Sequence, residues 1–122
     1  MAFQPISNSM IRASEAKGGN VLGLEPNQDP LIIVNYQFSW LLPLDDDKVR
    51  STVDRLIEKS VDLARSRGKL VDYMYLNYAH TGQAVIEGYG SDQVAFLKSV
   101  KAKYDPEGVF RSLVKGGFKV PA

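Results

Sequence analysis

The segment from Leu31 to Trp40 constrains the fold more than any other part of the 122-residue sequence. It reads LIIVNYQFSW, and every second side chain of an extended strand points to the same face. One face is fully apolar or aromatic, while the other begins with Leu31 and Ile33 and then turns polar. The residues of the first face are Ile32, Val34, Tyr36, Phe38 and Trp40. Because both faces carry apolar side chains, we expect a strand that is covered on both sides.

Three segments have the spacing and the end signals of helices. Residues 9–17 form a short candidate, with Ser7 or Asn8 as the cap and Gly18-Gly19 after its end. Residues 46–67 repeat apolar side chains at intervals of three and four, after an Asp45 or Asp46 cap and before Gly68. Residues 91–104 form the third, capped by Ser91 and stopped at Asp105-Pro106. Its inward side chains are expected to be Val94, Leu97, Val100 and Tyr104.

Two further segments are typical of strands. Residues 3–6 contain Pro5, which an edge strand tolerates best, and residues 71–79 read VDYMYLNYA with period-two alternation. Residues 25–30, EPNQDP, are rich in turn formers. The pattern predicts an α+β fold with an antiparallel sheet of about four strands and two long helices packed on one face. We expect a single domain over residues 1–122, with the other sheet face covered by a second copy in a homodimer.

Composition excludes several classes of function. The chain has no cysteine, so disulfides and cysteine-based zinc sites are excluded. Its 15 basic and 14 acidic residues give a formal net charge of +1, which provides no reason to expect nucleic acid or an anionic membrane as partner. No apolar run approaches the roughly 18 residues that cross a bilayer, and no signal peptide is visible. We therefore expect a cytoplasmic protein.

Polar and aromatic side chains alternate along two of the predicted strands. If the strands are neighbours in register, Asn35, Gln37, Tyr73, Tyr75 and Asn77 share one sheet face. Phenols and amides mixed in this way suit an aromatic ligand that carries oxygen atoms. The alternative is that these residues form an ordinary solvent face or a dimer contact.

A register slip of one residue would exchange that set for another. The exchanged set is Tyr36, Phe38, Trp40 and Tyr78, which we interpret as core. Trp40 and Tyr78 are nevertheless kept among the candidate substrate-binding residues, with Asn35, Gln37 and Tyr73.

His80 is the one histidine of the chain and follows the YLNY segment. An imidazole changes its charge near neutral pH, so His80 is the first candidate for a general base or acid. With Tyr75 and Asn77 it completes the candidate catalytic set. The alternative is a histidine in a surface loop, and Arg12 and Glu15 are possible supports.

Several motifs resemble the closing segment of fungal berberine-bridge-like FAD-linked oxidoreductases. They are YLNY at residues 75–78, Gln83, Gly88-Tyr89-Gly90, AFLKSVKAKYDPEGVF at residues 95–110, and GGFKV at residues 116–120. Weaker agreement is found in FQPIS at residues 3–7, in GGNVLGL at residues 18–24, and in the predicted strand that ends at Trp40 and is followed by DDD at residues 45–47. The resemblance therefore covers nearly the whole chain. It implies a substrate domain that roofs a flavin held by a separate N-terminal domain, with Tyr75, Asn77 and Tyr78 in the pocket.

The sequence also departs from this family pattern. His80 stands where fungal members usually carry an acidic residue, and residues 20–23, NVLG, stand where plant-type members place a catalytic acid. A chain of this length cannot hold both a flavin domain and its roof. We therefore expect no cofactor in the chain alone, and FAD only where a separate flavin domain is supplied.

Three hypotheses follow. The first is a cofactor-independent enzyme of isomerase, dehydratase or cyclase type that acts on a small aromatic or polyketide-like secondary metabolite. The second is the C-terminal part of a split FAD-dependent oxidoreductase, with a full-length FAD-linked relative as a possible partner. The third is a non-catalytic module that binds a ligand or regulates such a relative.

Overall fold

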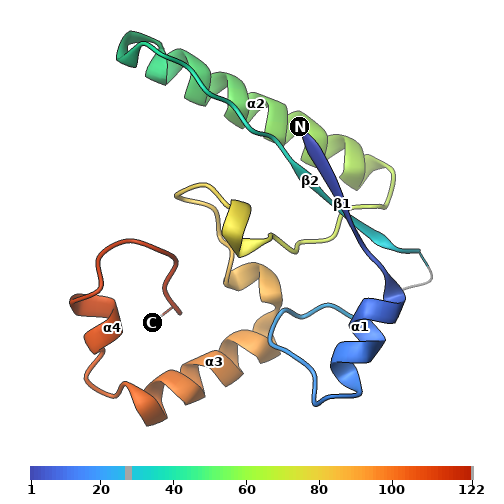
Figure 1. Ribbon diagram of the computed structural model, residues 1–122, viewed down its shortest axis with the longest axis vertical. Helices are drawn as coiled ribbons and strands as arrows, with labels where there is room; N and C mark the ends of the chain where they lie inside the picture. Colours follow the sequence, from blue (N-terminus) through green and yellow to red (C-terminus); the bar gives the residue numbers. More distant parts are fainter. Residues whose placement is uncertain (27–28, 122) are drawn as a thin grey trace. The chain divides into compact units, whose positions relative to one another are not determined.

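The computed structural model of the chain describes residues 1–26 and 29–121, which divide into two compact units (Figure 1). Unit 1 comprises residues 1–3 and 34–71, and unit 2 comprises residues 4–33 and 72–122. Strands and helices both occur, so the expected α+β class is confirmed, while a single domain stays a prediction. The elements are β1 (Ala2–Ile6), α1 (Asn8–Glu15), β2 (Leu31–Asn35), η1 (Pro43–Asp45), α2 (Asp46–Ser66), η2 (Leu76–Tyr78), η3 (Glu87–Tyr89), α3 (Ser91–Tyr104) and α4 (Val109–Ser112), where η denotes a 3-10 turn.

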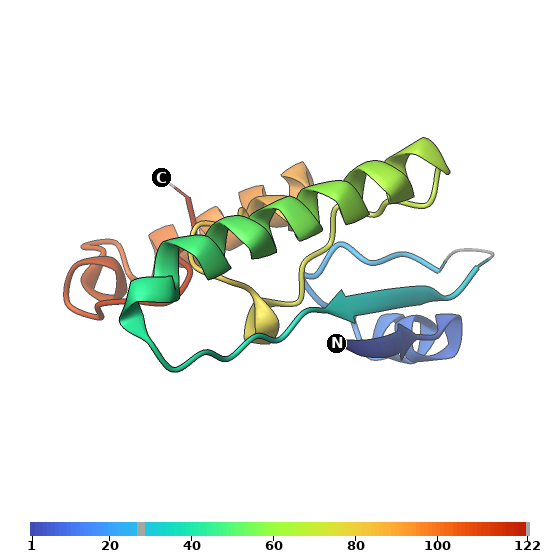
Figure 2. The same cartoon turned by 90° about the horizontal axis from the view of Figure 1, so that it is seen from above.

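The sheet of the described residues has two strands, β1 and β2, and their arrows run in opposite directions (Figure 2). The prediction of about four strands with two long helices on one face is therefore wrong. β1 confirms the short strand expected near residues 3–6, but β2 ends at Asn35 instead of Trp40. Both strands have five residues, so the chain beyond Asn35 has no strand to pair with. The turn expected at residues 25–30 includes residues 27 and 28, which lie outside the described residues.

Residues 71–79 do not form the predicted strand. They run without regular structure to Tyr75 and then close the 3-10 turn η2. The amide of Tyr78 donates to the carbonyl oxygen of Tyr75, and the amide of Ala79 donates to that of Leu76. A strand needs a neighbour to accept its amides, and in the described sheet β1 and β2 pair only with each other. The local turn satisfies these backbone groups instead.

The three predicted helices are confirmed, and so is one of their predicted caps. Ser7 caps α1 by accepting a hydrogen bond from the amide of Met10 at 3.3 Å. The predicted caps of α2 and α3 are not found: Asp45 makes no capping bond, and Gly90 rather than Ser91 precedes α3. Among the described residues, no helix combines the length and the apolar character that a bilayer span requires.

Unit 1 is a helix with an extended segment lying along it (Figures 1 and 2). Two hydrogen bonds join the segment to α2: Tyr36 Oη to Ser60 Oγ at 2.9 Å, and Trp40 Nε1 to Asp46 Oδ1 at 2.6 Å. The predicted stripe of α2 is its least exposed face, yet every member stays half-buried: Val49, Val53, Leu56, Ile57, Val61 and Ala64. No hydrophobic residue among the described residues of unit 1 is buried.

The interpretation of Phe38, Trp40 and Tyr78 as core residues is wrong, because these side chains are 47%, 40% and 46% exposed. Tyr36, the fourth member of that set, is half-buried. Phe38 and Trp40 lie beyond the end of β2, outside the described sheet. Tyr104, expected to face inward on α3, is 72% exposed.

The core of unit 2 lies where η3 leads into α3. Val85, Ile86 and Tyr89 are buried, and Val85 has no exposed surface. Partly buried side chains from four separate segments pack against them: Leu22, Tyr73, Met74, Ala79, Val94, Leu97 and Phe118. The inward positions predicted for Val94 and Leu97 are thus confirmed. This cluster joins the N-terminal loop, the YLNY segment, α3 and the C-terminal tail.

Two glycines allow backbones to approach closely beside this core. Gly23 has φ +67°, and a Cβ atom there would overlap the carbonyl oxygen of Tyr89. A Cβ atom on Gly88 would likewise overlap the carbonyl oxygen of Asp72. Glycine is needed at Gly23 for its conformation and at both positions for space.

Replacing Gly23 by alanine should therefore destabilise the chain strongly. We expect Gly23→Ala to lower the free energy of unfolding by about 3 kcal/mol, the sum of a left-handed alanine and a backbone overlap. Gly19→Ala is the matched control, since its φ is +79° and nothing lies within 4 Å of the added Cβ. That variant should lose only about 1 kcal/mol. Urea unfolding followed by circular dichroism measures both, and equal losses would contradict the close approach.

Candidate functional site

The YLNY turn gathers three of the predicted site residues. Asn77 Nδ2 donates to Tyr75 Oη at 2.9 Å, and the rings of Tyr75 and Tyr78 meet edge to face with centroids 4.9 Å apart. Gln4 Nε2, from β1, donates to Tyr78 Oη at 3.3 Å. Tyr75 is half-buried, while Asn77 and Tyr78 are exposed. The result is a small aromatic surface with two amides and two phenols, and we call Gln4, Tyr75, Asn77 and Tyr78 the YLNY cluster.

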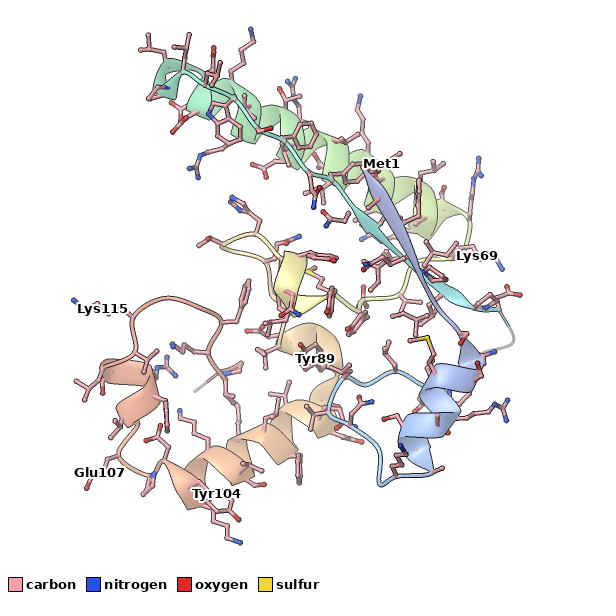
Figure 3. The ribbon with its side chains drawn as sticks, viewed as in Figure 1. Met1, Lys69, Tyr89, Tyr104, Glu107 and Lys115 are labelled. Atoms are coloured by element: carbon pink, nitrogen blue, oxygen red, sulfur yellow. The ribbon has the colours of Figure 1, made fainter. Side chains whose placement is uncertain are left out.

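Tyr73 lies at the buried end of the same segment. Its ring stacks on that of Tyr89, with centroids 6.1 Å apart and an interplanar angle of 24°. Figure 3 shows Tyr89 where the YLNY segment passes into α3. Burial raises the pKa of Tyr73, and the neighbouring phenols of Tyr89 and Tyr75 raise it further. Burial also raises the pKa of Tyr89. Both phenols therefore keep their protons to a higher pH than an exposed tyrosine does, and their stacked rings belong to the hydrophobic core.

His80 begins the loop after the cluster. Its backbone amide donates to Gln83 Oε1 at 2.7 Å, and its ring Nδ1 lies 2.8 Å from the carbonyl oxygen of Thr81. A carbonyl can only accept, so Nδ1 carries the hydrogen in this bond and Nε2 remains available as an acceptor. The side chain is exposed. The loop thus fixes the orientation of a ring nitrogen that could take up a proton.

The remaining predicted substrate-binding residues, Asn35, Gln37 and Trp40, lie in unit 1. Asn35 is buried at 8% exposure, Gln37 is exposed, and the indole nitrogen of Trp40 is bonded to Asp46. Because residues 71–79 are not a strand, the prediction that Asn35, Gln37, Tyr73, Tyr75 and Asn77 share one sheet face is wrong. A role for Asn35, Gln37 and Trp40 in substrate binding stays a prediction. Arg12 and Glu15 are exposed on α1.

Gln4 and Tyr89 belong to the site but were missed as site residues. Tyr89 carried a signal, since it lies between the two glycines of the GYG motif. Gln4 carried none, because its hydrogen bond to Tyr78 joins residues 74 positions apart. Pairing over such a separation depends on the fold and leaves no local pattern.

The KYDPEGVF motif has a structural role. Asp105 Oδ1 accepts from the amide of Val109 at 2.7 Å, and its Oδ2 accepts from the amide of Phe110 at 3.2 Å. Gly108 takes the left-handed conformation that lets the chain turn back onto this carboxylate. The aspartate therefore ends α3 and caps α4.

The glycine-rich segments of the described residues do not have the surroundings of a dinucleotide-binding loop. Gly18-Gly19 follow α1, and Gly116-Gly117 lie in the tail. Gly88 and Gly90 precede α3, but no strand leads into them, as a dinucleotide-binding loop requires. Within the described ranges we find no cradle for the phosphates of FAD. The YLNY cluster itself offers flat contact area and directional hydrogen bonds to an oxygen-bearing ring.

Comparison with known proteins confirms the resemblance seen in the sequence. Residues 74–113 match the family model described as berberine and berberine like. The chain is 39% identical over 120 residues to FAD-dependent monooxygenase tpcD of Cochliobolus heterostrophus, which is 98% of this chain and 23% of that protein. It is 42% identical over 107 residues to FAD-dependent monooxygenase sdcF of Emericella nidulans, 88% of this chain and 22% of that protein.

A third relative, bifunctional solanapyrone synthase of Alternaria solani, is 31% identical over 117 residues, 96% of this chain and 22% of that protein. No solved structure matches the chain. The chain thus spans less than a quarter of the length of these curated relatives. It is related over nearly its whole length to the C-terminal segment of berberine-bridge-type FAD-dependent oxidoreductases of fungi.

The raised pKa of Tyr73 predicts how stability depends on pH. The folded chain holds the phenolic proton more tightly than the unfolded chain, whose tyrosines titrate near pH 10. The stabilisation is therefore complete below about pH 10 and is lost as the pH rises toward the folded pKa. Tyr73→Phe should make this fall shallower in urea unfolding measured from pH 8 to 11, in roughly half-unit steps. Tyr104→Phe, at an exposed tyrosine, is the control, and a Tyr73→Phe profile parallel to wild type would refute the assignment.

Proposed function

We propose that this chain acts as the C-terminal, substrate-side segment of a fungal FAD-dependent oxidoreductase and works only when joined to a flavin-binding portion. The main observation in support is the extent of the match. Up to 98% of this chain aligns with no more than 23% of each named FAD-dependent relative. More than three quarters of each relative has no counterpart here. The flavin-binding portion is either part of a longer polypeptide or a separate chain.

The exposure of unit 1 supports this proposal. Leu41 and Leu44 are 97% and 94% exposed, at the turn between the extended segment and α2. Burying a leucine side chain contributes about 1.5–3 kcal/mol, so leaving both in water forgoes a large stabilisation. An exposed apolar turn of this kind marks an interaction surface. We propose that the flavin-binding portion contacts this surface. The alternative is that a second copy of the chain contacts it.

Within the proposed enzyme, the YLNY cluster would contact the substrate. The rings of Tyr75 and Tyr78 provide a flat surface, and the Asn77 amide and the phenols provide directional hydrogen bonds. This combination suits a small aromatic or polyketide-like metabolite. His80 Nε2 would take up or release a proton beside it. FAD, held by the other portion, would supply the redox chemistry.

The stand-alone, cofactor-independent enzyme has less support. The relatives named above are FAD-dependent monooxygenases and a synthase, and each is more than four times as long as the matched segment. The hypothesis of an isomerase, dehydratase or cyclase is supported only by the residue types of the candidate site. A homodimer and a cytoplasmic location remain predictions.

The first test reconstitutes the enzyme from two parts. The chain is mixed with tpcD of Cochliobolus heterostrophus expressed without the segment that matches this chain. We expect the two polypeptides to elute together in size-exclusion chromatography, with visible flavin absorbance in the shared peak. Leu41→Ser with Leu44→Ser should weaken the complex at least roughly tenfold, because two leucines lose their burial.

The control is Arg50→Ser, an exposed residue on α2, which should leave the complex unchanged. The leucine variant should also leave the circular dichroism of the isolated chain unchanged, since these side chains are almost fully solvated already. If the chain never binds the flavin portion and converts substrate without it, the proposal is wrong. Dimerisation of the chain that is lost with the leucine variant would assign the surface to a second copy.

The second test concerns the YLNY cluster in the reconstituted enzyme. Asn77→Ala removes the donor to Tyr75 Oη, and we expect kcat/KM to fall roughly tenfold, the value of one hydrogen bond. Complex formation and flavin content should not change, because Asn77 is exposed. Gln93→Ala, which removes an amide from α3 outside the cluster, is the control. Unchanged kcat/KM in Asn77→Ala would remove the cluster from the site.

A further inference from the structure

Unit 2 contains an apolar groove that is separate from the YLNY cluster. After α4 the tail curls back toward α3, as Figures 1 and 3 show around Lys115. The groove between them has a volume of about 370 Å³. Its apolar lining comes from α3, α4 and the tail: Leu97, Val100, Tyr104, Phe110, Val114, Phe118 and Val120. Phe110 is 67% exposed and Val114 is 49% exposed, so the groove opens to solvent.

The charged residues of the groove are mostly basic. Lys101, Arg111 and Lys119 line it together with one acid, Asp105. Among the described residues, the side chains of these three cations make no hydrogen bond or ion pair. Asp105, in contrast, already accepts from the amides of Val109 and Phe110 at the start of α4. The groove therefore combines an apolar floor with three available positive charges.

The dimensions of the groove favour a small molecule over a protein segment. On α3 it extends over the eight residues from Leu97 to Tyr104, and the rise between the first and the last of them is roughly 10 Å. An amphipathic partner helix of three turns would need about 16 Å. A volume of about 370 Å³ falls within the range of small-molecule sites. The long stems of lysine and arginine can pack on the apolar floor while their charged ends reach the rim.

We propose that this groove binds an apolar carboxylic acid, with its hydrocarbon part along α3 and its carboxylate at Lys101, Arg111 and Lys119. The site would be distinct from the oxidoreductase site proposed above and does not depend on it. Hydrocarbon burial supplies the affinity, and the cations select an anion over an uncharged or cationic analogue.

Decanoate is the test probe, titrated into the full 122-residue chain and followed by ¹H–¹⁵N NMR. We expect saturable shifts at Leu97, Phe110 and Phe118. Decylammonium, which has the same chain length and the opposite charge, should bind at least roughly tenfold more weakly. The affinity for decanoate should fall as salt is added, because the charges at the rim are screened.

The variants distinguish recognition of the carboxylate charge from nonspecific hydrophobic binding. Lys101→Gln, Arg111→Gln and Lys119→Gln combined should weaken decanoate roughly tenfold, the sum of three partly exposed ion pairs. Lys59→Gln is the matched control, since Lys59 is an exposed lysine of α2 and does not line the groove. Equal affinities for the two probes, an equal loss in Lys59→Gln, or shifts centred on Leu41 and Leu44 would each overturn the proposal.

Discussion

The packing of Val85, Ile86 and Tyr89 is the interaction on which the rest of unit 2 depends. These residues are buried at the entry to α3, and they collect side chains from the N-terminal loop, the YLNY segment and the tail. The segments are distant in sequence, and this cluster brings them into contact. Gly23 and Gly88 allow the surrounding backbones to close around it. The YLNY segment is therefore tied to this core on both sides, by Tyr73 and Met74 before it and by Ala79 after it.

Unit 1 shows what happens where such a core is missing. Its helix has a well-formed apolar stripe, yet each member of that stripe is half-buried and the adjoining leucines are in water. Two side-chain hydrogen bonds, from Tyr36 and Trp40, hold the extended segment on α2. Hydrogen bonds of this kind contribute about 1 kcal/mol each, far less than a packed layer. This imbalance is the physical reason for our proposal that unit 1 contacts the flavin-binding portion.

The sequence predicted the helices well because their determinants are local. The apolar spacing of residues 46–67, the Ser7 cap and the Asp105-Pro106 stop each act within a few residues. The strand predictions were less successful because a strand depends on residues that are distant in sequence. Tyr73, Tyr75 and Asn77 alternate as in a strand, but a strand also needs a partner, and the sequence does not say whether one is present. The same reason explains why β2 stops at Asn35 and why Gln4 was missed.

The motifs that identify the family divide into two groups by their physical role. Asp105 caps a helix, Gly88 makes room for a carbonyl group, and Tyr89 fills the core. Asn77 is different, because its side chain is exposed and its amide donates to Tyr75 Oη without reaching the buried core. A residue that defines the fold would be expected to occur with or without activity. Asn77 has no such structural reason, and it is therefore the residue of the motif that we propose for a role in chemistry.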